Sequence, residues 1–166
     1  MTLTIKILKE DMLHLVKTEA YTTGESIKDG TPVDISRASK SQATNDDDYL
    51  LTKYIDSGVS DVIDMLSGHM TSAHVTSEET TTDKGFDTIQ YRFCLDLPAT
   101  YDHNQDTALR EGIIDYIAQY TLYKWYKRVL PDMADPTELD KIRSNIIHRV
   151  NQRVRPVRRP IRPLNF

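Results

Sequence analysis

Residues 106–130, DTALREGIIDYIAQYTLYKWYKRVL, form the longest stretch of helical periodicity in the chain and decide its fold class. Apolar side chains recur three and four positions apart, which is the spacing of one side of an α-helix. This stripe consists of Leu109, Ile113, Tyr116, Ile117 and Tyr120. Tyr123, Trp125 and Tyr126 follow on several faces before Pro131 ends the pattern. Such aromatics can stack the bases of single-stranded nucleic acid, but at helical spacing we expect them in the core or at a subunit contact.

A second helix is predicted after Asp46, Asp47 and Asp48, with its exit near Gly68. Its apolar stripe consists of Leu51, Ile55, Val59, Val62, Ile63 and Leu66. Carboxylates are favourable at the positive end of a helix dipole, and one of the three can accept a backbone N–H as the N-cap. Three adjacent carboxylates also suggest a divalent metal, but the wider ligand spacing of a calcium loop is missing, so we interpret them as a cap.

The last helix has a clear start signal in Asp135, Pro136 and Glu138. These residues supply a cap, a proline at the first helical position and a carboxylate at the third, which resembles a capping box. The predicted buried stripe of this helix consists of Leu139, Ile142, Ile146 and Val150. We therefore expect three long helices, one after Asp48, one at about residues 106–130 and one after Asp135.

The N-terminal part of the chain is less regular. Residues 3–20 carry apolar side chains at three- and four-residue spacing, which predicts a short amphipathic helix. Those side chains are Leu8, Met12, Leu15, Val16 and Ala20. Residues 21–45 are rich in Thr, Ser, Gly, Asp and Lys and contain Pro32, so we predict a polar loop or flexible insertion there.

A change of period marks the β structure. From Ile89 the chain alternates apolar and polar residues up to Pro98, which predicts a half-buried strand. A turn at residues 83–85 would return the chain to a partner strand at 73–76. The predicted fold is mostly α with a small β element: a helical bundle with one β-hairpin or short antiparallel sheet. We expect one domain at residues 1–152 and an extended C-terminal arm at 153–166.

Charge is unevenly distributed along the chain. Lys141 to Phe166 contains eight of the 21 Lys and Arg and none of the 25 Asp and Glu, so the rest of the chain carries −12. Three prolines in the arm disfavour a helix and favour an extended segment. Apolar residues lie between its arginines, which a purely electrostatic or simply solvated tail does not need. The predicted interface consists of Arg153, Arg155, Pro156, Val157, Arg158, Arg159, Pro160, Ile161, Arg162, Leu164 and Phe166.

The sequence contains few recognisable catalytic or metal-binding motifs. Cys94 is the only cysteine, and the five histidines lack a spacing that completes a zinc site. No phosphate-binding loop, dinucleotide-binding turn, zinc-protease motif or nucleophile elbow is present. No apolar run is long enough to span a bilayer, and the first nine residues do not resemble a signal peptide. We therefore expect a non-enzymatic protein without cofactor, metal, small-molecule substrate or membrane contact.

The order of elements resembles the head-to-tail connector, or adaptor, proteins of tailed bacteriophages. The resemblance lies in residues 17–24 (KTEAYTTG), 46–51 (DDDYLL), 91–98 (YRFCLDLP) and 123–127 (YKWYK), and it covers roughly residues 6–130. It implies a small helical bundle whose copies form a ring between the portal and the tail, around the DNA channel. It further implies a virion protein of the head-tail junction, made in the host bacterial cytoplasm, with portal and tail proteins as partners. The polar stretch at 21–45 and the arm depart from this pattern.

Two partners for the arm remain open at this stage. In a ring, an arm that is basic can lie across the acidic body of the next copy through a heterologous contact, or it can dock on a different phage protein. The alternative function is a nucleic-acid-binding accessory protein whose arm contacts phosphates, although an acidic body is repelled by DNA. The sequence fixes neither the copy number of the ring nor which end faces the capsid.

Overall fold

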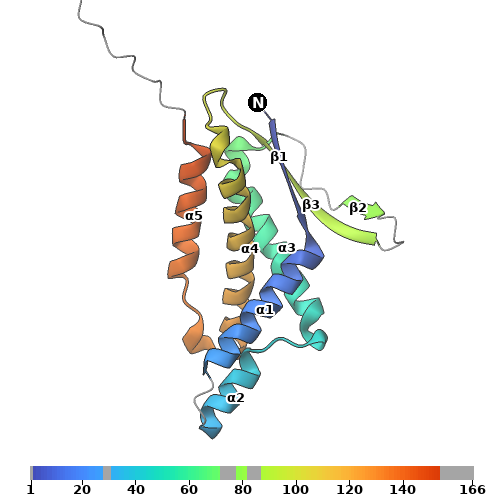
Figure 1. The fold of residues 1–166 in the computed structure, drawn as a ribbon, viewed down its shortest axis with the longest axis vertical. Coiled ribbons are helices and arrows are strands. Elements are labelled where there is room, and N and C mark those ends of the chain that lie inside the picture. Colours follow the sequence, from blue (N-terminus) through green and yellow to red (C-terminus); the bar gives the residue numbers. More distant parts are fainter. Residues whose placement is uncertain (1, 28–30, 72–77, 82–86, 154–166) are drawn as a thin grey trace, which may run out of the picture.

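The computed structural model describes residues 2–27, 31–71, 78–81 and 87–153. Its main elements are β1 (Thr2–Leu8), α1 (Lys9–Ile27), α2 (Pro32–Ser41), α3 (Asp48–Leu66), β2 (Glu78–Thr81), β3 (Asp87–Asp96), α4 (Asp106–Val129) and α5 (Thr137–Val150). Four long helices form a bundle, the strands lie beside one end of it, and α2 lies at the other end (Figure 1). The predicted class, a mostly helical bundle with a short antiparallel sheet, is confirmed.

Helix α4 occupies the middle of the bundle and contacts α1, α3 and α5. Because it is surrounded in this way, it is buried on several faces rather than along one stripe. Its buried residues are Leu109, Ile113, Tyr116, Ile117, Ala118, Thr121, Leu122, Trp125 and Tyr126. The expectation that the aromatic residues of this segment belong to the core is confirmed for Trp125 and Tyr126, which are 4% and 8% exposed.

The sheet has the strand order β1-β3-β2, and both outer strands run antiparallel to β3. The predicted alternation in β3 is confirmed, because Tyr91, Phe93 and Leu95 are buried while Cys94 on the other face is partly exposed. One partner of β3 is β2, close in sequence to the predicted partner strand. The predicted strand at 73–76 and its turn at 83–85 lie outside the described residues.

The other partner, β1, corrects the prediction for the N-terminus. Residues Thr2–Leu8 form a strand paired with Asp96 to Gln90 of β3, whereas a helix was expected from residue 3. This stretch alternates, with Ile5 and Ile7 buried on one face, and its β-branched residues favour a strand. The helical spacing is genuine only from Met12 onward, where α1 buries every fourth residue on α4 and α3.

The prediction of a polar loop at residues 21–45 is wrong. Helix α1 continues to Ile27, and α2 begins with Thr31, whose hydroxyl accepts the Asp34 backbone N–H at 3.2 Å. Thr31, Pro32 and Asp34 form a start signal for α2 of the kind seen before α5, but the polar composition of the stretch led to the prediction of a loop. The helix is held by a few close contacts, including a hydrogen bond of 3.0 Å from Trp125 Nε1 to the buried carbonyl of Ser41.

The two later helices begin near the predicted positions, but the cap before α3 differs from the prediction of an aspartate N-cap. Thr44 occupies the cap position, and its backbone N–H and hydroxyl donate to Asp47 Oδ2 at 2.9 Å as part of a capping box. Before α5, Asp135 Oδ1 accepts the Thr137 backbone N–H at 2.9 Å. Hydrogen bonds from Thr137 lower the pKa of the exposed Asp135 carboxyl. The predicted stripe of α5 also faces the core.

Gly24 marks the closest approach of α1 and α2. A Cβ at this position would lie 2.6 Å from Ser41 Oγ and 2.9 Å from the Ala38 carbonyl oxygen. Alanine favours a helix over glycine by about 1 kcal/mol. We nevertheless expect Gly24→Ala to lower the free energy of unfolding by about 1 to 3 kcal/mol, because α2 must move away. Gly68→Ala is the control, since no atom lies within 4 Å of its added Cβ; chemical denaturation of both variants measures the difference, and equal stability would contradict this packing.

A row of carboxylates runs from α4 to α1. Partial desolvation and the nearby Glu111 carboxylate raise the pKa of Asp115. Desolvation and Asp115 in turn raise the pKa of Glu19, which accepts a 3.3 Å hydrogen bond from Gln119 Nε2. A raised carboxyl pKa means that the charged form disfavours the folded state above that pKa, and that this penalty vanishes at pH values below the unfolded-state pKa.

Asp115→Asn should therefore stabilise the protein at neutral pH. The expected gain is below about 1 kcal/mol, because the side chain is largely exposed and its interactions are screened. The gain should disappear near pH 3, where aspartate is protonated in both states. Thermal unfolding at both pH values measures it, and a gain that persists at low pH would show that the cause is not electrostatic.

Candidate protein-docking groove

The predicted interface can be followed in the structure only to its first residue. Arg153 forms an antiparallel bridge with Tyr101, just before α4, and Arg149 Nη1 donates to Gln105 Oε1 at 2.8 Å. These contacts fix the point where the arm leaves the body, beside the N-terminal end of α4. The other predicted interface residues, from Arg155 to Phe166, lie outside the described residues.

The body carries a surface groove that the sequence did not predict. It lies between α1 and the connection from α2 to α3, with a volume of about 480 Å³. Its lining residues are Glu10, Leu13, His14, Lys17, Thr18, Tyr21 and Ala43. All of them except Ala43 belong to α1. Met12, Val16 and Ala20 on the same helix are buried in the bundle, and the lining residues lie on the part of α1 that remains at the surface.

Apolar groups make up part of the groove lining. Leu13 and Ala43 are half-buried and pack against the hydrophobic core. Tyr21 also lines the groove and is 56% exposed, so its ring is accessible to a ligand. The hydroxyl of Thr18 donates to the His14 carbonyl at 2.9 Å. The lining thus combines an aromatic ring with aliphatic groups.

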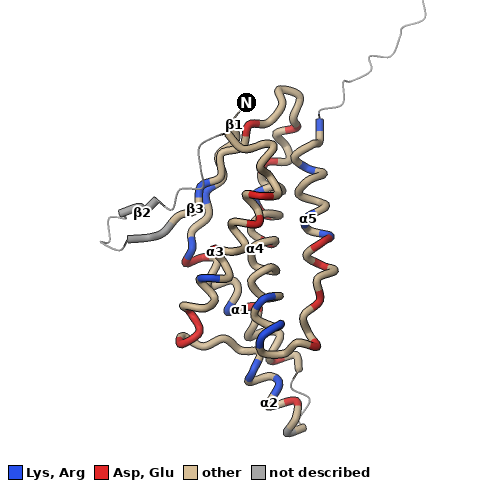
Figure 2. Tube along the Cα trace, turned by 180° about the vertical axis from the view of Figure 1, so that it is seen from behind, with Lys and Arg blue, Asp and Glu red and all other residues tan. Residues whose placement is uncertain are grey.

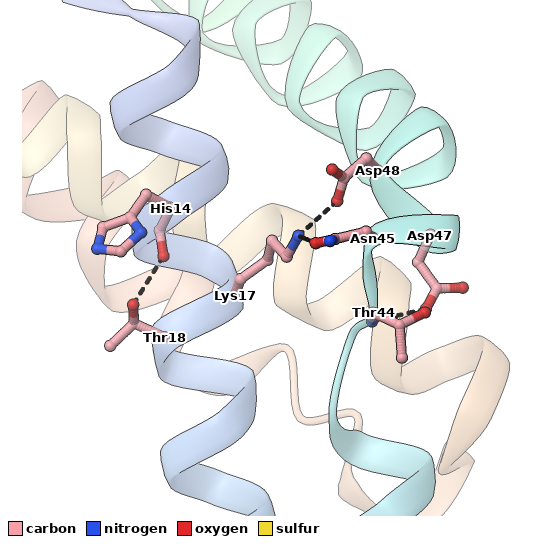
Figure 3. A network of polar contacts seen from close by, with 7 residues as sticks. All are labelled: His14, Lys17, Thr18, Thr44, Asn45, Asp47 and Asp48. Carbon is pink, nitrogen blue, oxygen red and sulfur yellow. Dashed lines mark hydrogen bonds and ion pairs between the residues drawn. The ribbon is translucent and has the colours of Figure 1, made fainter.

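Lys17 holds the two walls of the groove together (Figure 3). Its ammonium donates to Asn45 Oδ1 at 2.7 Å and to Asp48 Oδ1 at 2.8 Å. Asn45 belongs to the short 3-10 turn η1 (Asn45–Asp47), whose position is further fixed by the capping box between Thr44 and Asp47. The Asp46–Asp48 trio thus serves as a helix start and as a tie to α1.

Acidic residues lie near the groove. Glu10 is the one carboxylate in its lining, which also contains Lys17 and His14. Lys17 pairs with Asp48, and Asp46 and Asp47 belong to η1, which also contains Asn45, the second partner of Lys17. One residue beyond Asp48, Tyr49 is 73% exposed, and the Lys53 ammonium lies 4.5 Å from its ring centroid. A basic and partly apolar ligand therefore suits this surface.

The groove offers several kinds of contact group. It is open to solvent, and its lining combines an aromatic ring and aliphatic groups with one carboxylate, one ammonium group and one imidazole. Within the described ranges, no three His, Cys, Asp or Glu side chains gather closely enough to hold a metal ion. Apolar contacts with polar groups around them are a common composition of protein interfaces.

The sequence contained a usable signal for the groove. Leu13, Lys17 and Tyr21 recur at helical spacing on the side of α1 that flanks the buried residues Met12, Val16 and Ala20. The expectation of a loop from residue 21 hid this face, because it ended the helix before Tyr21. Ala43 and Asn45 could not be placed without knowing that α2 packs on Trp125.

Comparisons with protein-family models, with curated proteins and with solved structures give no match for this chain. Among the described helices, none combines the length and the apolar character needed to cross a membrane. The function is therefore argued from the residues and from their arrangement.

Lys17→Gln should loosen the groove wall formed by η1. We expect the free energy of unfolding to fall by about 1 kcal/mol, because a half-buried ion pair and a second hydrogen bond are lost. Amide hydrogen exchange at residues 44–48 should become faster, since this is the segment that Lys17 anchors.

Lys141→Gln is the matched control for this variant. Lys141 pairs with Glu138 at 3.1 Å on the exposed surface of α5, at three-residue spacing. Its loss should change stability by less than about 0.5 kcal/mol and leave exchange at 44–48 unchanged. Equal effects of the two substitutions would contradict the anchoring role of Lys17.

Proposed function

We propose that this chain is a non-enzymatic structural protein of a tailed-phage virion. Its copies form a ring at the head-tail junction, between the portal and the tail, and the basic C-terminal arm of each copy docks on the next. The proposal joins the resemblance to connector proteins with the charge pattern of the chain and the geometry of the body.

The elements behind the resemblance support it. The KTEAYTTG stretch lies within α1, and the DDDYLL stretch spans the start of α3. The YRFCLDLP stretch covers most of β3, and YKWYK lies in the last part of α4. Each motif thus belongs to an element of the kind the resemblance implies, except that a strand precedes the first helix.

One observation carries the proposal: Arg153, after which the arm begins, and the groove lie on different sides of the body. Helix α5 packs on α4, whereas α1 and the start of α3 lie on the other side of α4 (Figure 1). Two complementary surfaces at different places on one chain produce a head-to-tail contact between copies. Such a contact closes into a ring when the rotation between neighbours permits it.

The charge distribution is suited to such a contact. Acidic positions are spread over α3, α4 and α5, while the chain leaves α5 through Arg149 and Arg153 (Figure 2). Each exposed ion pair contributes only about 0.2 to 1 kcal/mol. The apolar residues of the arm must therefore supply much of the affinity, at up to about 1.5 to 3 kcal/mol for each fully buried side chain. Charge then mainly steers the arm and sets its register.

Removing residues 154–166 should abolish the ring. Among the residues that the structure describes, the buried core lies between Ile5 and Val150, so the truncated chain is expected to retain its fold. We expect native mass spectrometry and negative-stain electron microscopy to find closed rings for the full chain and monomers for the truncated one. Far-ultraviolet circular dichroism checks the fold of both.

Other outcomes point to the rival functions. Rings that survive truncation would contradict a role of the arm in assembly. A full-length monomer that binds duplex DNA, with an affinity falling by about one logarithmic unit per phosphate contact for each tenfold rise in salt, would favour the nucleic-acid alternative. A full-length monomer that binds only portal or tail protein would place the arm's partner outside this chain.

A further inference from the structure

The residues of the arm fall into three distinct rows when they are read at a period of three. One row is entirely apolar and consists of Val154, Val157, Pro160, Pro163 and Phe166. All four arginines beyond Arg153 fall in the other two rows. A period of three belongs to the polyproline II helix, which a segment with three prolines favours. In that conformation the arm would present one apolar edge flanked by positive charge.

We propose that the groove between α1 and η1 receives the arm of a neighbouring copy, bound as a polyproline II helix. This inference rests on the proposed ring, and it names the receiving surface and the bound conformation. Polyproline II segments bind grooves that offer aromatic rings to their prolines and aliphatic residues. Tyr21, Leu13 and Ala43 supply such groups in the lining.

The charges around the groove match those of the arm. Glu10 lines the groove, and Asp46 and Asp47 belong to η1, next in sequence to Asn45 and Asp48, which bind the lining residue Lys17. The arm brings arginines on both sides of its apolar row and contains no Asp or Glu. The Lys17 ammonium is paired with the Asp48 carboxylate and also donates to Asn45. It therefore repels the arginines of the arm less than an unpaired lysine would.

The lengths are also compatible. From Glu10 to Tyr21, α1 rises about 17 Å, whereas a polyproline II helix advances about 3 Å per residue. The groove therefore accommodates about five or six residues of the arm, enough for two successive members of the apolar row, such as Val157 and Pro160. The remaining residues can bridge the two bodies, because the whole arm spans about 40 Å when extended.

Two other surfaces fit the arm less well. The outer edge of β1 is free of described partners, but Lys6 pairs across the sheet with Arg92, and these cations repel an arginine-rich strand. The groove between α4 and α5 carries Glu111 and Asp115, but it is smaller, about 180 Å³, and has no aromatic residue in its lining. Neither surface offers the combination of nearby acidic residues and an aromatic lining residue.

Disulfide trapping in the full chain tests the inference. In a Cys94→Ser background, which removes the only native cysteine, Thr18→Cys in the groove is combined with Val157→Cys in the arm. Ser144→Cys with Val157→Cys is the control. Thr18 and Ser144 are both exposed helical hydroxyls that donate to the carbonyl four residues earlier at 2.9 Å. Mild oxidation should give a ladder of covalent multimers for the Thr18 pair and at least about tenfold less for the control.

Every other pattern overturns the inference in a recognisable way. A disulfide within one chain would place the arm on its own body. A ladder from the Ser144 pair, or intact rings without a ladder from the Thr18 pair, would place the arm elsewhere on the neighbour and leave the proposed ring standing. Absence of rings in the unmodified chain would instead contradict the proposed function itself.

A second measurement tests the bound conformation. Val157→Ser removes an apolar group from the predicted row, whereas Ile161→Ser removes a similar group from a different row. The concentration at which rings dissociate should rise by about tenfold or more for Val157→Ser, and by much less for Ile161→Ser. An equal or reversed effect would rule out the polyproline II conformation, because in a strand or an α-helix Val157 and Ile161 would not be separated into different rows in this way.

Discussion

The burial of α4 on several faces is the constraint on which the rest of the structure depends. A helix of 24 residues surrounded in this way needs a partner on each side, and α1, α3 and α5 supply them. Gly58 lets α3 come close, because a Cβ there would lie 3.2 Å from a ring carbon of Tyr120. Five residues further along α4, the indole of Trp125 donates to the Ser41 carbonyl. Together with the close approach of Gly24 to Ala38 and Ser41, this contact helps to place α2 and the connection that lines the groove.

The sequence predicted the elements whose signals are local. The stripe of α4, the acidic start of α3, the Asp135 cap of α5 and the alternation in β3 each reflect a period or a cap within one element. It failed where long-range contacts decide or where polar composition outweighed a local signal. Ile5 and Ile7 are buried because β3 lies beside them, whereas α2 has a local start at Thr31 and Pro32 and packs on Trp125 and Gly24. The groove was missed for the same reason, since its two walls lie about thirty residues apart in sequence.

The polar residues of the groove serve structure and recognition together. Lys17 is committed to Asp48 and Asn45, so the groove keeps its shape before any ligand arrives. Such preorganisation reduces the ordering that binding requires. The carboxylates near the groove can then attract a cation from a distance, which speeds encounter more than it strengthens the final complex. Affinity must come chiefly from contacts with Tyr21 and Leu13.

The bridge between Tyr101 and Arg153 fixes one end of the arm to the rigid end of the bundle. A segment tethered there explores a restricted volume, so its effective concentration near an adjacent copy reaches the millimolar range when the reach matches the separation. At such a concentration, individually weak contacts would be sufficient to hold the proposed ring together. The subunit that completes the proposed ring would gain two contacts at once, by offering its own arm and receiving another. Closed assemblies would consequently be favoured over open chains, and partly formed ones would be scarce at equilibrium.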